Sequence, residues 1–400
     1  MANANSTTPS LPFHRGDSPL DPPAVFAEWR AEGPIRRIAI ANGGTAWLVT
    51  RYKEMREVLG DPRMSSDITK TGFPSPRPEE PKPSLGNFMQ MDPPDHAAMR
   101  RTVTRTFMIK NVERLRPRIT ELTNNLLDAM EEMPRPVDLL THFARPLPSQ
   151  VICELFGVPY ADRELFLSNS ATIGDMRATE AEAYAARTAI AEYLIRLVEE
   201  KERHPGDDMF SDLAVNRLRT GELTKEEIGG MGALLVIGGH ESTASMIGLG
   251  TIVLLQHPEQ LQRFLTEPEV RPAAIEELFR YLSIVHVSLR RVATADLEIG
   301  GVTVRKGEGL IIPIHSANRD PDAFDAPDEF DISRDARHHL SFGHGIHQCI
   351  AQHVGRLELQ IALPALFQRF PGLRLAVPFE EIDFREDNVV YSVNELPITW

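Results

Sequence analysis

The sequence predicts a mainly α-helical protein with a small β region, an α+β architecture. Apolar residues recur at helical spacing over most of 96–280. From residue 283 the pattern changes to short apolar runs separated by glycine turns. The chain of 400 residues is longer than a single core usually grows, so two lobes or two domains are expected.

The N-terminal part is expected to begin with a flexible tail. Residues 1–12 are polar and lack a secretory signal pattern. Residues 23–33 predict a short helix, and 35–52 predict a hairpin with its turn at 42–44. The Pro-rich segment 73–84 must be a loop, and a loop of this length is usually functional or mobile.

The central helices follow from apolar periodicity. The stretch 111–133 predicts one helix, and 161–203 predicts two helices. A long apolar helix is expected over 224–256, ended by the His-Pro pair that follows it. Its part 231–255 is long enough to span a bilayer. The histidine and glutamate near its middle are costly in lipid, so a helix buried inside a soluble protein is favoured.

The C-terminal part is expected to hold one helix between short strands. Residues 349–370 predict a helix, which Pro364 should end or kink. Residues 388–400 predict a strand. The helix carries one apolar stripe, formed by Ile350, Val354, Leu357 and Ile361.

Composition limits the classes of partner and location. The net charge of −14 argues against general nucleic-acid or anionic-membrane binding. The only two cysteines are Cys153, expected to be a core thiol, and Cys349, so no disulfide framework is expected. We therefore expect a cytoplasmic, monomeric protein with no nucleic-acid and no membrane partner.

The segment SFGHGIHQCIAQH, residues 341–353, has the residue types of a metal site. Zinc is disfavoured because Cys349 has no partner pair elsewhere. His344 and His347 are three residues apart, but their Gly-containing stretch is not expected to be helical.

The alternative is a haem iron held by the Cys349 thiolate. Gly343 and Gly345 allow a sharp turn and a close approach of the porphyrin. Cys349 precedes a predicted helix, where free N–H groups and the helix dipole favour an anion.

The same segment resembles the haem loop of the cytochrome P-450 family, F-G-x-G-x-H-x-C, in the soluble actinobacterial style. The family usually has Gly two residues after the cysteine, where this chain has Ala351. The resemblance implies haem b with Cys349 as axial ligand. It also implies the family fold, a triangular helical lobe plus a smaller β-rich lobe, as one domain over 13–400. The matching positions are Phe342, Gly343, Gly345, His347 and Cys349.

A second motif, EELFR, places Glu277 and Arg280 three residues apart on a helix, where their side chains meet. In the family, this spacing forms a buried structural network with a third basic residue downstream. The matching position here is Arg334.

A third motif, GGHEST, resembles the family's distal-helix signature. Gly238 and Gly239 are poor helix residues, and a local opening there would make room for dioxygen. Glu241 and Ser242 form an acid–alcohol pair that can relay protons while dioxygen is activated. Most relatives have Thr at the alcohol position, and Thr243 could partly compensate.

A fourth set is expected to bind the haem propionates. His96 and Arg100 are four residues apart at a helix start, so one face can meet an anion. By resemblance, Arg291, with Arg290 as a further candidate, and His347 complete the set. The remaining histidines near the haem loop match no functional position of the family and are interpreted as surface or packing residues: His338, His339, His344 and His353.

The chain holds no segment resembling a flavin or nicotinamide domain, so a separate donor must supply electrons. The resemblance implies a ferredoxin with its reductase. Residues 97–118 contain one acid, Glu113, among many bases and predict a basic docking patch. Its members are Arg100, Arg101, Arg105, Lys110, Arg114, Arg116 and Arg118.

The resemblance implies O2-dependent hydroxylation or epoxidation of a bulky, largely apolar natural product such as a macrolide, polyketide, terpenoid or steroid-like compound. A nitric-oxide-reductase-like member and a non-catalytic haem carrier or sensor are the alternatives; Glu241 argues against both. His286 and Ser288 are the nearby polar candidates. The expected pocket residues are Leu234, Leu235, Ile237, Val285, Val287 and Val390.

Overall fold

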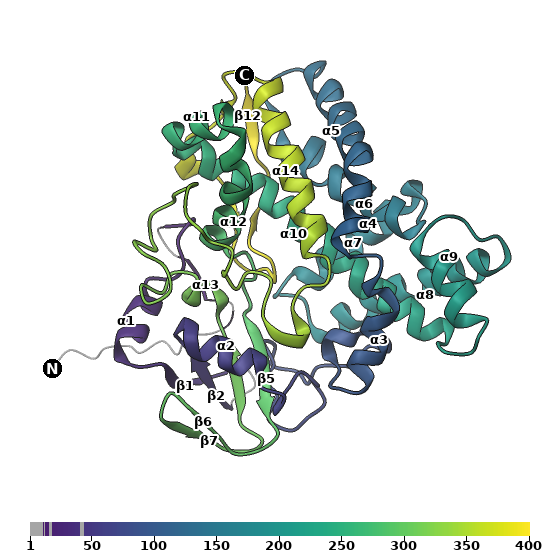
Figure 1. Ribbon diagram of the computed structural model, residues 1–400, viewed down its shortest axis with the longest axis vertical. Coiled ribbons are helices and arrows are strands. Elements are labelled where there is room, and N and C mark those ends of the chain that lie inside the picture. Colours follow the sequence, from purple (N-terminus) through teal and green to yellow (C-terminus); the bar gives the residue numbers. More distant parts are fainter. Residues whose placement is uncertain (1–10, 12, 16–17, 41–43) are drawn as a thin grey trace.

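A computed structural model describes residues 11, 13–15, 18–40 and 44–400 of the protein. Its outline is triangular, with a broad helical lobe and a smaller strand-rich lobe at the lower left (Figure 1). The predicted mainly α architecture with a small β region is confirmed. Apart from Leu11, the predicted tail lies outside the described residues, as do residues 42 and 43 of the predicted turn.

The helical lobe surrounds the long helix α10. Its helices are α3 (Asp95–Thr104), α4 (Ile109–Val112), α5 (Arg116–Glu131), α6 (Pro146–Phe156), α7 (Arg163–Gly174), α8 (Glu180–Arg203), α9 (Met209–Leu213), α10 (Lys225–Gln256), α11 (Pro258–Thr266), α12 (Arg271–Leu282) and α14 (Gln352–Arg369).

Helix α10 is the structural centre because nearly all of its surface is covered. Its first turn is fixed by a capping box, in which Thr224 accepts from the Glu227 N–H and Glu227 accepts from the Thr224 N–H. Helices α6, α8, α12 and α14 pack against it. The predicted buried helix is confirmed. No helix among the described residues is both long and apolar enough to cross a membrane.

The strand-rich lobe is built from both ends of the chain. Its main sheet has the order β1-β2-β8-β5-β3, in which only the β2–β8 pair is parallel. Helices α1 (Val25–Glu32), α2 (Tyr52–Gly60) and α13 (Ile314–Ala317) lie in this lobe (Figure 1). The sheet strands are β1 (Ile35–Ala39), β2 (Thr45–Val49), β3 (Met64–Ser65), β5 (Leu289–Ala293) and β8 (Gly309–Ile312).

The remaining strands form three small sheets. β6 (Leu297–Ile299) pairs with β7 (Val302–Val304), and β10 (Phe384–Arg385) pairs with β11 (Ser392–Val393). β12 (Pro397–Thr399) lies between β4 (Val137–Asp138) and β9 (Arg374–Leu375). The predicted C-terminal strand is therefore two short strands in different sheets.

Two helix predictions need correction. The helix expected over 111–133 is divided into α4 and α5 by the short turn Glu113–Leu115. Pro364 does not end α14, which continues to Arg369. Packing of α14 against α5 and α10 holds the helix together despite the backbone hydrogen bond that proline removes.

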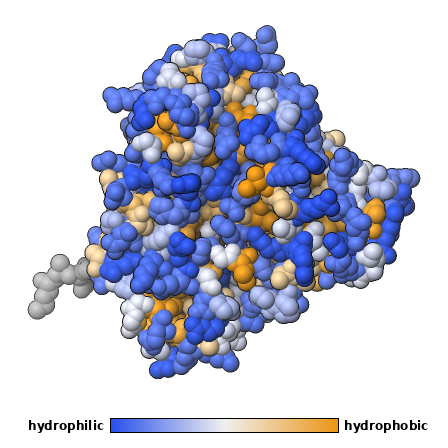
Figure 2. Space-filling view, viewed as in Figure 1, coloured by the Kyte–Doolittle hydropathy of each residue, from blue (hydrophilic) through white to orange (hydrophobic). Residues whose placement is uncertain are grey.

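On the face shown in Figure 2, hydrophilic side chains predominate, and apolar side chains form separate small patches. The largest apolar core lies inside the helical lobe and includes residues of α5, α6, α10, α12 and α14. A second core lies between the main sheet and α2. The loop that carries Cys349 joins these lobes.

Candidate functional site

The Cys349 loop is shaped by two glycines with left-handed backbone angles. Gly343 has φ 72° and Gly345 has φ 73°, a conformation that side chains disfavour. A Cβ on Gly345 would lie 2.4 Å from the Leu59 carbonyl oxygen, so only glycine fits there. The Cys349 N–H donates to the Phe342 carbonyl at 2.8 Å and closes the turn.

The Cys349 sulfur lies just before α14 rather than inside its first turn. Burial raises the pKa of the thiol, and the N–H groups of Ala351 and Gln352, together with Arg100 and Arg356, act in the opposite direction. The backbone donors expected from the sequence are therefore present. These donors favour the thiolate form of Cys349 when its negatively charged sulfur binds a metal ion.

Two histidines and two arginines lie around this loop. The rings of His96 and His347 have centroids 4.2 Å apart, although they come from distant segments. Arg100 Nη2 donates to the Gln348 carbonyl at 2.6 Å. Burial, together with the positive charges of Arg291, His96 and Arg100, lowers the pKa of His347 to about 3. The structure thus brings together the four predicted basic groups.

None of these four groups has a carboxylate within 4.0 Å among the described residues, and the charge of Asp92 acts on His96 and Arg291 from a greater distance. His96 is buried, and its Nε2 has no hydrogen-bond partner. Arg291 has one hydrogen bond, from Nη1 to the Arg290 carbonyl at 2.7 Å, and burial lowers its pKa to about 10. Buried cations need a negative partner. The two propionates of haem have that charge, so the residues present fit the expected cofactor.

Space beside α10 supports the same fit. A Cβ on Gly238 would meet no atom within 4 Å. A Cβ on Gly239 would lie 2.5 Å from Ile152 of α6, so Gly239 serves helix packing and does not face the open space. Of the two glycines predicted to make room for dioxygen, this geometry favours Gly238 alone.

The expected opening of the distal helix is not observed, because α10 runs without interruption through this motif. The hydroxyl of Ser242 donates to the Gly238 carbonyl at 2.8 Å, and that of Thr243 donates to the Gly239 carbonyl at 3.2 Å. These bonds keep both hydroxyls on the helix while its backbone stays intact.

Glu241 has a partner that the sequence did not indicate. Arg385 Nη1 of β10 donates to Glu241 Oε1 at 2.6 Å, and His240 Nε2 lies 3.6 Å from Oε2. Arg385 also contributes to lowering the pKa of Asp175, at the end of α7. Because Arg385 is 144 residues from Glu241, no local spacing could have indicated the pair.

A second acid near the motif was also missed. Glu358 of α14 is buried near Thr243, and burial raises its pKa to about 8 against the opposing effect of the Thr243 hydroxyl. Its position four residues after Val354, on the apolar side of the helix, was the available signal. The carboxyl is therefore held mainly protonated beside α10 at neutral pH.

The predicted structural network is confirmed in its contacts. Glu277 and Arg280 are fully buried, and their two hydrogen bonds measure 2.6 and 2.7 Å. Arg334 Nε reaches Glu277 Oε1 at 3.2 Å. The carbonyls of Asn318, Pro327 and Glu329 accept the remaining Arg280 donors.

The predicted pocket residues divide into partly exposed and buried positions. Val285 and Val390 form an antiparallel β-bridge, and both keep some exposed surface, as do Leu234 and Ile237. The more fully buried pair is Leu235 and Val287.

Of the two polar candidates, His286 is excluded. It is buried, its Nε2 is 2.8 Å from the Phe13 carbonyl, and its ring packs against Tyr391. Ser288 is buried with an unpartnered hydroxyl.

The other histidines have packing roles. His338 stacks on Phe324 with ring centroids 4.3 Å apart, and His339 lies 3.1 Å from Glu276. Among the described residues, no group of three or more histidine, cysteine, aspartate or glutamate side chains could hold a metal ion.

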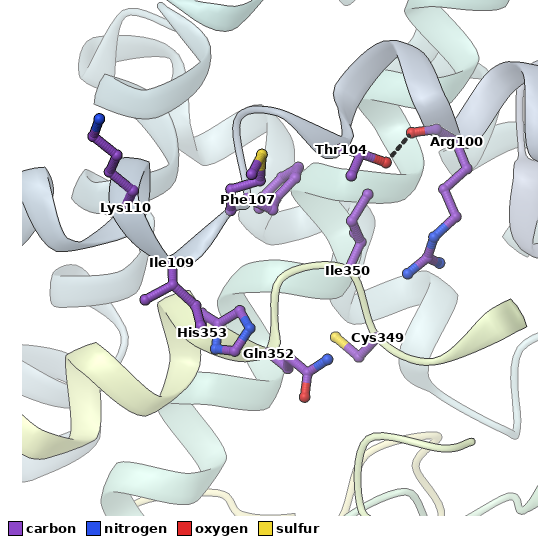
Figure 3. Close-up of a pocket in the computed structure, with 10 residues that line it drawn as sticks. Arg100, Thr104, Phe107, Ile109, Lys110, Cys349, Ile350, Gln352 and His353 are labelled. Carbon is purple, nitrogen blue, oxygen red and sulfur yellow. Dashed lines mark hydrogen bonds between the residues drawn. The ribbon is translucent and has the colours of Figure 1, made fainter. Parts of the chain in front are cut away.

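A surface pocket of about 390 Å³ opens beside Cys349 (Figure 3). Figure 3 shows Arg100 extending from α3 toward Cys349, with Lys110 at the opposite end of the pocket. Met108 and Ile109 line it and are 55% and 59% exposed. The pocket thus combines a basic rim with exposed apolar side chains.

The predicted basic patch is smaller than the sequence suggested. Arg116 pairs with Glu113, and Arg118 pairs with Glu121 and Glu154. The remaining exposed bases have no carboxylate within 4.0 Å among the described residues: Arg101, Arg105, Lys110 and Arg114.

Comparison with known proteins gives matches along almost the whole chain. The family model described as Cytochrome P450 matches residues 25–382. "Cytochrome P450-SU2" of Streptomyces griseolus is 44% identical, with 100% of each chain covered. "Pentalenic acid synthase" of Streptomyces avermitilis is 43% identical and covers 96% of this chain and 95% of its own. The crystal structure of CYP105P1 in complex with filipin I aligns with a TM-score of 0.93 at 38% identity, over 98% and 99% of the two chains.

Proposed function

Because the chain belongs to the cytochrome P450 family, whose members are haem-thiolate monooxygenases, we propose that it hydroxylates or epoxidises a bulky, largely apolar natural product. Two relatives support the substrate class. One is named for the synthesis of pentalenic acid, and the other was crystallised with filipin I. The observation that carries the proposal is the buried Arg291, which has no carboxylate within 4.0 Å among the described residues and lies with Arg100, His96 and His347 around the Cys349 loop, because the haem propionates would supply the missing negative charge.

The residues present have defined tasks toward haem. Cys349 would bind its iron, and the N–H groups of Ala351 and Gln352 would stabilise the thiolate. His96, Arg100, Arg291 and His347 would hold the propionates. When bound, the haem iron supplies the site at which dioxygen is activated.

The side chains on α10 would handle protons. Glu241 can exchange a proton with water, and the Ser242 and Thr243 hydroxyls follow one and two residues later on the same helix. Arg385 holds Glu241 in one orientation through its 2.6 Å hydrogen bond. If Glu241 and these hydroxyls moved out of place, proton delivery would weaken and the yield of product from O2 would fall.

The electron donor is proposed to be a ferredoxin, served by its reductase, that docks over the Cys349 pocket in the cytoplasm. The unpaired bases Arg101 and Arg105 would steer an acidic partner, and the exposed Met108 and Ile109 would supply apolar contact. Replacing Arg101 and Arg105 by Glu should weaken turnover with ferredoxin and leave peroxide-driven turnover unchanged. Equal loss of both activities would contradict this docking site.

The monooxygenase assignment is tested by spectroscopy. The reduced protein with carbon monoxide should absorb at about 450 nm, as expected for a thiolate ligand. Cys349→Ala should abolish this band. The matched control His344→Ala should keep it, because the His344 ring lies beside Gly60. A spectrum typical of histidine-ligated haem would contradict the monooxygenase assignment.

A further inference from the structure

Arg290 and Arg291 are neighbours on β5, but they face opposite sides of the strand. Leu289, on the same side as Arg291, lies 3.7 Å from where a Cβ of Gly343 in the haem loop would be. Arg290 turns instead toward the Pro-rich loop at 73–84. Its guanidinium carbon is 5.7 Å from the centre of the Phe73 ring. Arg290 is therefore not placed to join the propionate set.

Arg290 is a buried charge without an acidic partner. Burial, reinforced by the positive charges of Arg77 and Arg291, lowers its pKa to about 10. Among the described residues it makes one hydrogen bond, from Nη1 to the Pro74 carbonyl at 3.4 Å, and no carboxylate lies within 4.0 Å. A guanidinium has five N–H donors, so most of its capacity is unused.

The nearest acid cannot neutralise Arg290, because it is already shared. Glu180, at the start of α8, forms an ion pair with Arg187 and lies 3.7 Å from Arg77 Nη1. Arg77 is itself bound to three backbone carbonyls of the α7–α8 connection, those of Ile173, Asp175 and Ala178. Within 4.0 Å, Glu180 is thus the one carboxylate that Arg77 and Arg187 share among the described residues, and Glu79 and Asp175 act on Arg77 from a greater distance.

The location of Arg290 connects it to the expected substrate site. Arg77 ties the 73–84 loop to the α7–α8 connection. The resemblance to the family implies that both segments contribute contacts to the substrate. Arg290 lies beneath this junction. It keeps part of its surface accessible although its charge is strongly desolvated, so a bound ligand could still reach its guanidinium.

We propose that Arg290 is the anion-binding residue of the substrate site, and that the substrate carries a carboxylate at one end of its apolar body. This inference rests on the proposed function and names a chemical group of its substrate. A carboxylate offers two oxygens to the fork of a guanidinium, and such charge-assisted pairs are strong inside proteins. The Phe73 ring would pack against the cation from the other side.

The test compares matched pairs of probes with the holoenzyme. Each pair is a carboxylic acid and its primary amide, one built on a dodecyl chain and one on a diterpenoid skeleton. Affinity is measured at neutral pH by equilibrium dialysis and by the spin-state shift of the haem. Because hydrogen bonds to charged groups are worth about 1.5–3 kcal/mol, at least one acid should bind about 10- to 100-fold more tightly than its amide.

Variants of Arg290 test whether this residue causes the preference for the acid over the amide. Arg290→Gln should remove the preference for the acid, and Arg290→Lys should keep part of it, since lysine retains the charge but not the fork. The control Arg305→Gln, at an exposed ion pair with Asp296, should bind as the wild type does. Equal affinity within every pair, including no binding by either member, would overturn the proposal, and so would a preference that survives Arg290→Gln.

The wild-type comparison remains decisive if Arg290→Gln does not fold. Failure of this inference is also distinct from failure of the proposed function. A protein with the carbon monoxide band at about 450 nm and no preference for acids is a monooxygenase without this subsite. A protein without the band is not the proposed enzyme, whatever it binds.

Discussion

Buried charges are neutralised in two different ways in this protein. In the Glu277–Arg280 cluster, every donor of the Arg280 guanidinium has an acceptor within the chain. Beside Cys349, Arg291 has one bond to a neighbouring carbonyl, and His96 Nε2 has none. Both regions are buried, but only the first is complete without a ligand.

The difference separates residues that hold the fold from residues that await a ligand. A buried charge that the chain satisfies can be retained for structure alone. A buried charge that the chain leaves unsatisfied costs folding free energy, which only a bound anion can offset. Removal of a residue should therefore have opposite effects on the protein without haem in the two regions.

The largest effect is expected at the complete cluster. Arg280→Met leaves the buried Glu277 carboxylate without its two shortest bonds and with Arg334 at 3.2 Å as its remaining cation, which should lower the free energy of unfolding by about 3–5 kcal/mol. Urea unfolding should show this loss both with and without haem. The control Arg337→Met, at an exposed pair with Asp335, should change little. Unchanged stability of Arg280→Met would break the comparison.

A smaller and conditional effect is expected at the incomplete cluster. Arg291→Gln removes an uncompensated buried cation, so the haem-free protein should keep or gain stability in urea. The holoprotein should lose haem to an apo-globin acceptor about tenfold faster, because one charge-assisted bond is missing. If the haem-free variant is destabilised like Arg280→Met, Arg291 belongs with the structural charges.

The dependence of the free energy of unfolding on acidic pH extends the comparison to Glu276, another buried charge whose partners lie within the chain. Burial opposes ionisation of Glu276, but hydrogen bonds from His339 and Arg356 outweigh it and lower its pKa to about 2. In the unfolded chain the carboxyl has an ordinary pKa and binds a proton first as the pH falls. The stability that Glu276 contributes is thus present above about pH 4.5 and is lost as the pH falls toward 2.

Glu276→Gln should make urea unfolding less sensitive to pH over this range, by about 1–3 kcal/mol between its ends. The matched control is Glu57→Gln, at an exposed carboxyl whose partner Lys53 lies 3.9 Å away. If the free energy of unfolding fell as steeply with decreasing pH in Glu276→Gln as in the wild type, other carboxyls would be responsible for the acid sensitivity.

Sequence reasoning succeeded where the information is local. The haem loop depends on glycines at fixed offsets, and the Glu277–Arg280 contact depends on one helical turn, so both motifs could be recognised from short stretches of sequence, while the burial of the pair came from the family resemblance. It failed where tertiary packing decides. Pro364 was expected to end or kink its helix, but it does not end α14, which continues to Arg369.

Pairs of residues far apart in the chain are the second kind of feature that the sequence did not predict. The partner of Glu241 comes from β10, and its choice depends on how the C-terminal hairpin docks against α10. The side of β5 that Arg290 faces depends on strand register, which the apolar pattern around it does not fix. Charge, burial and pairing of such residues become evident only in three dimensions.

The smallest expected effect concerns Arg385, which lies between the two classes. It is satisfied by Glu241, yet both side chains keep about a fifth of their surface exposed, at 18% and 21%. Loss of the pair should therefore cost less than about 1 kcal/mol in unfolding. Its larger consequence should be on proton handling, because Glu241 loses the contact that fixes its orientation.

Arg385→Gln should lower product formed per electron pair consumed by about three- to tenfold, with a raised solvent deuterium isotope effect. Arg385→Lys should restore part of the yield, since it keeps a charge beside the carboxylate. Glu241→Gln should lose more, about 100-fold, because the proton-exchanging group itself is gone. A structural role alone would lower stability without changing the isotope effect. An unchanged isotope effect in Arg385→Gln would therefore place Arg385 with Arg280, among the charges that serve the fold.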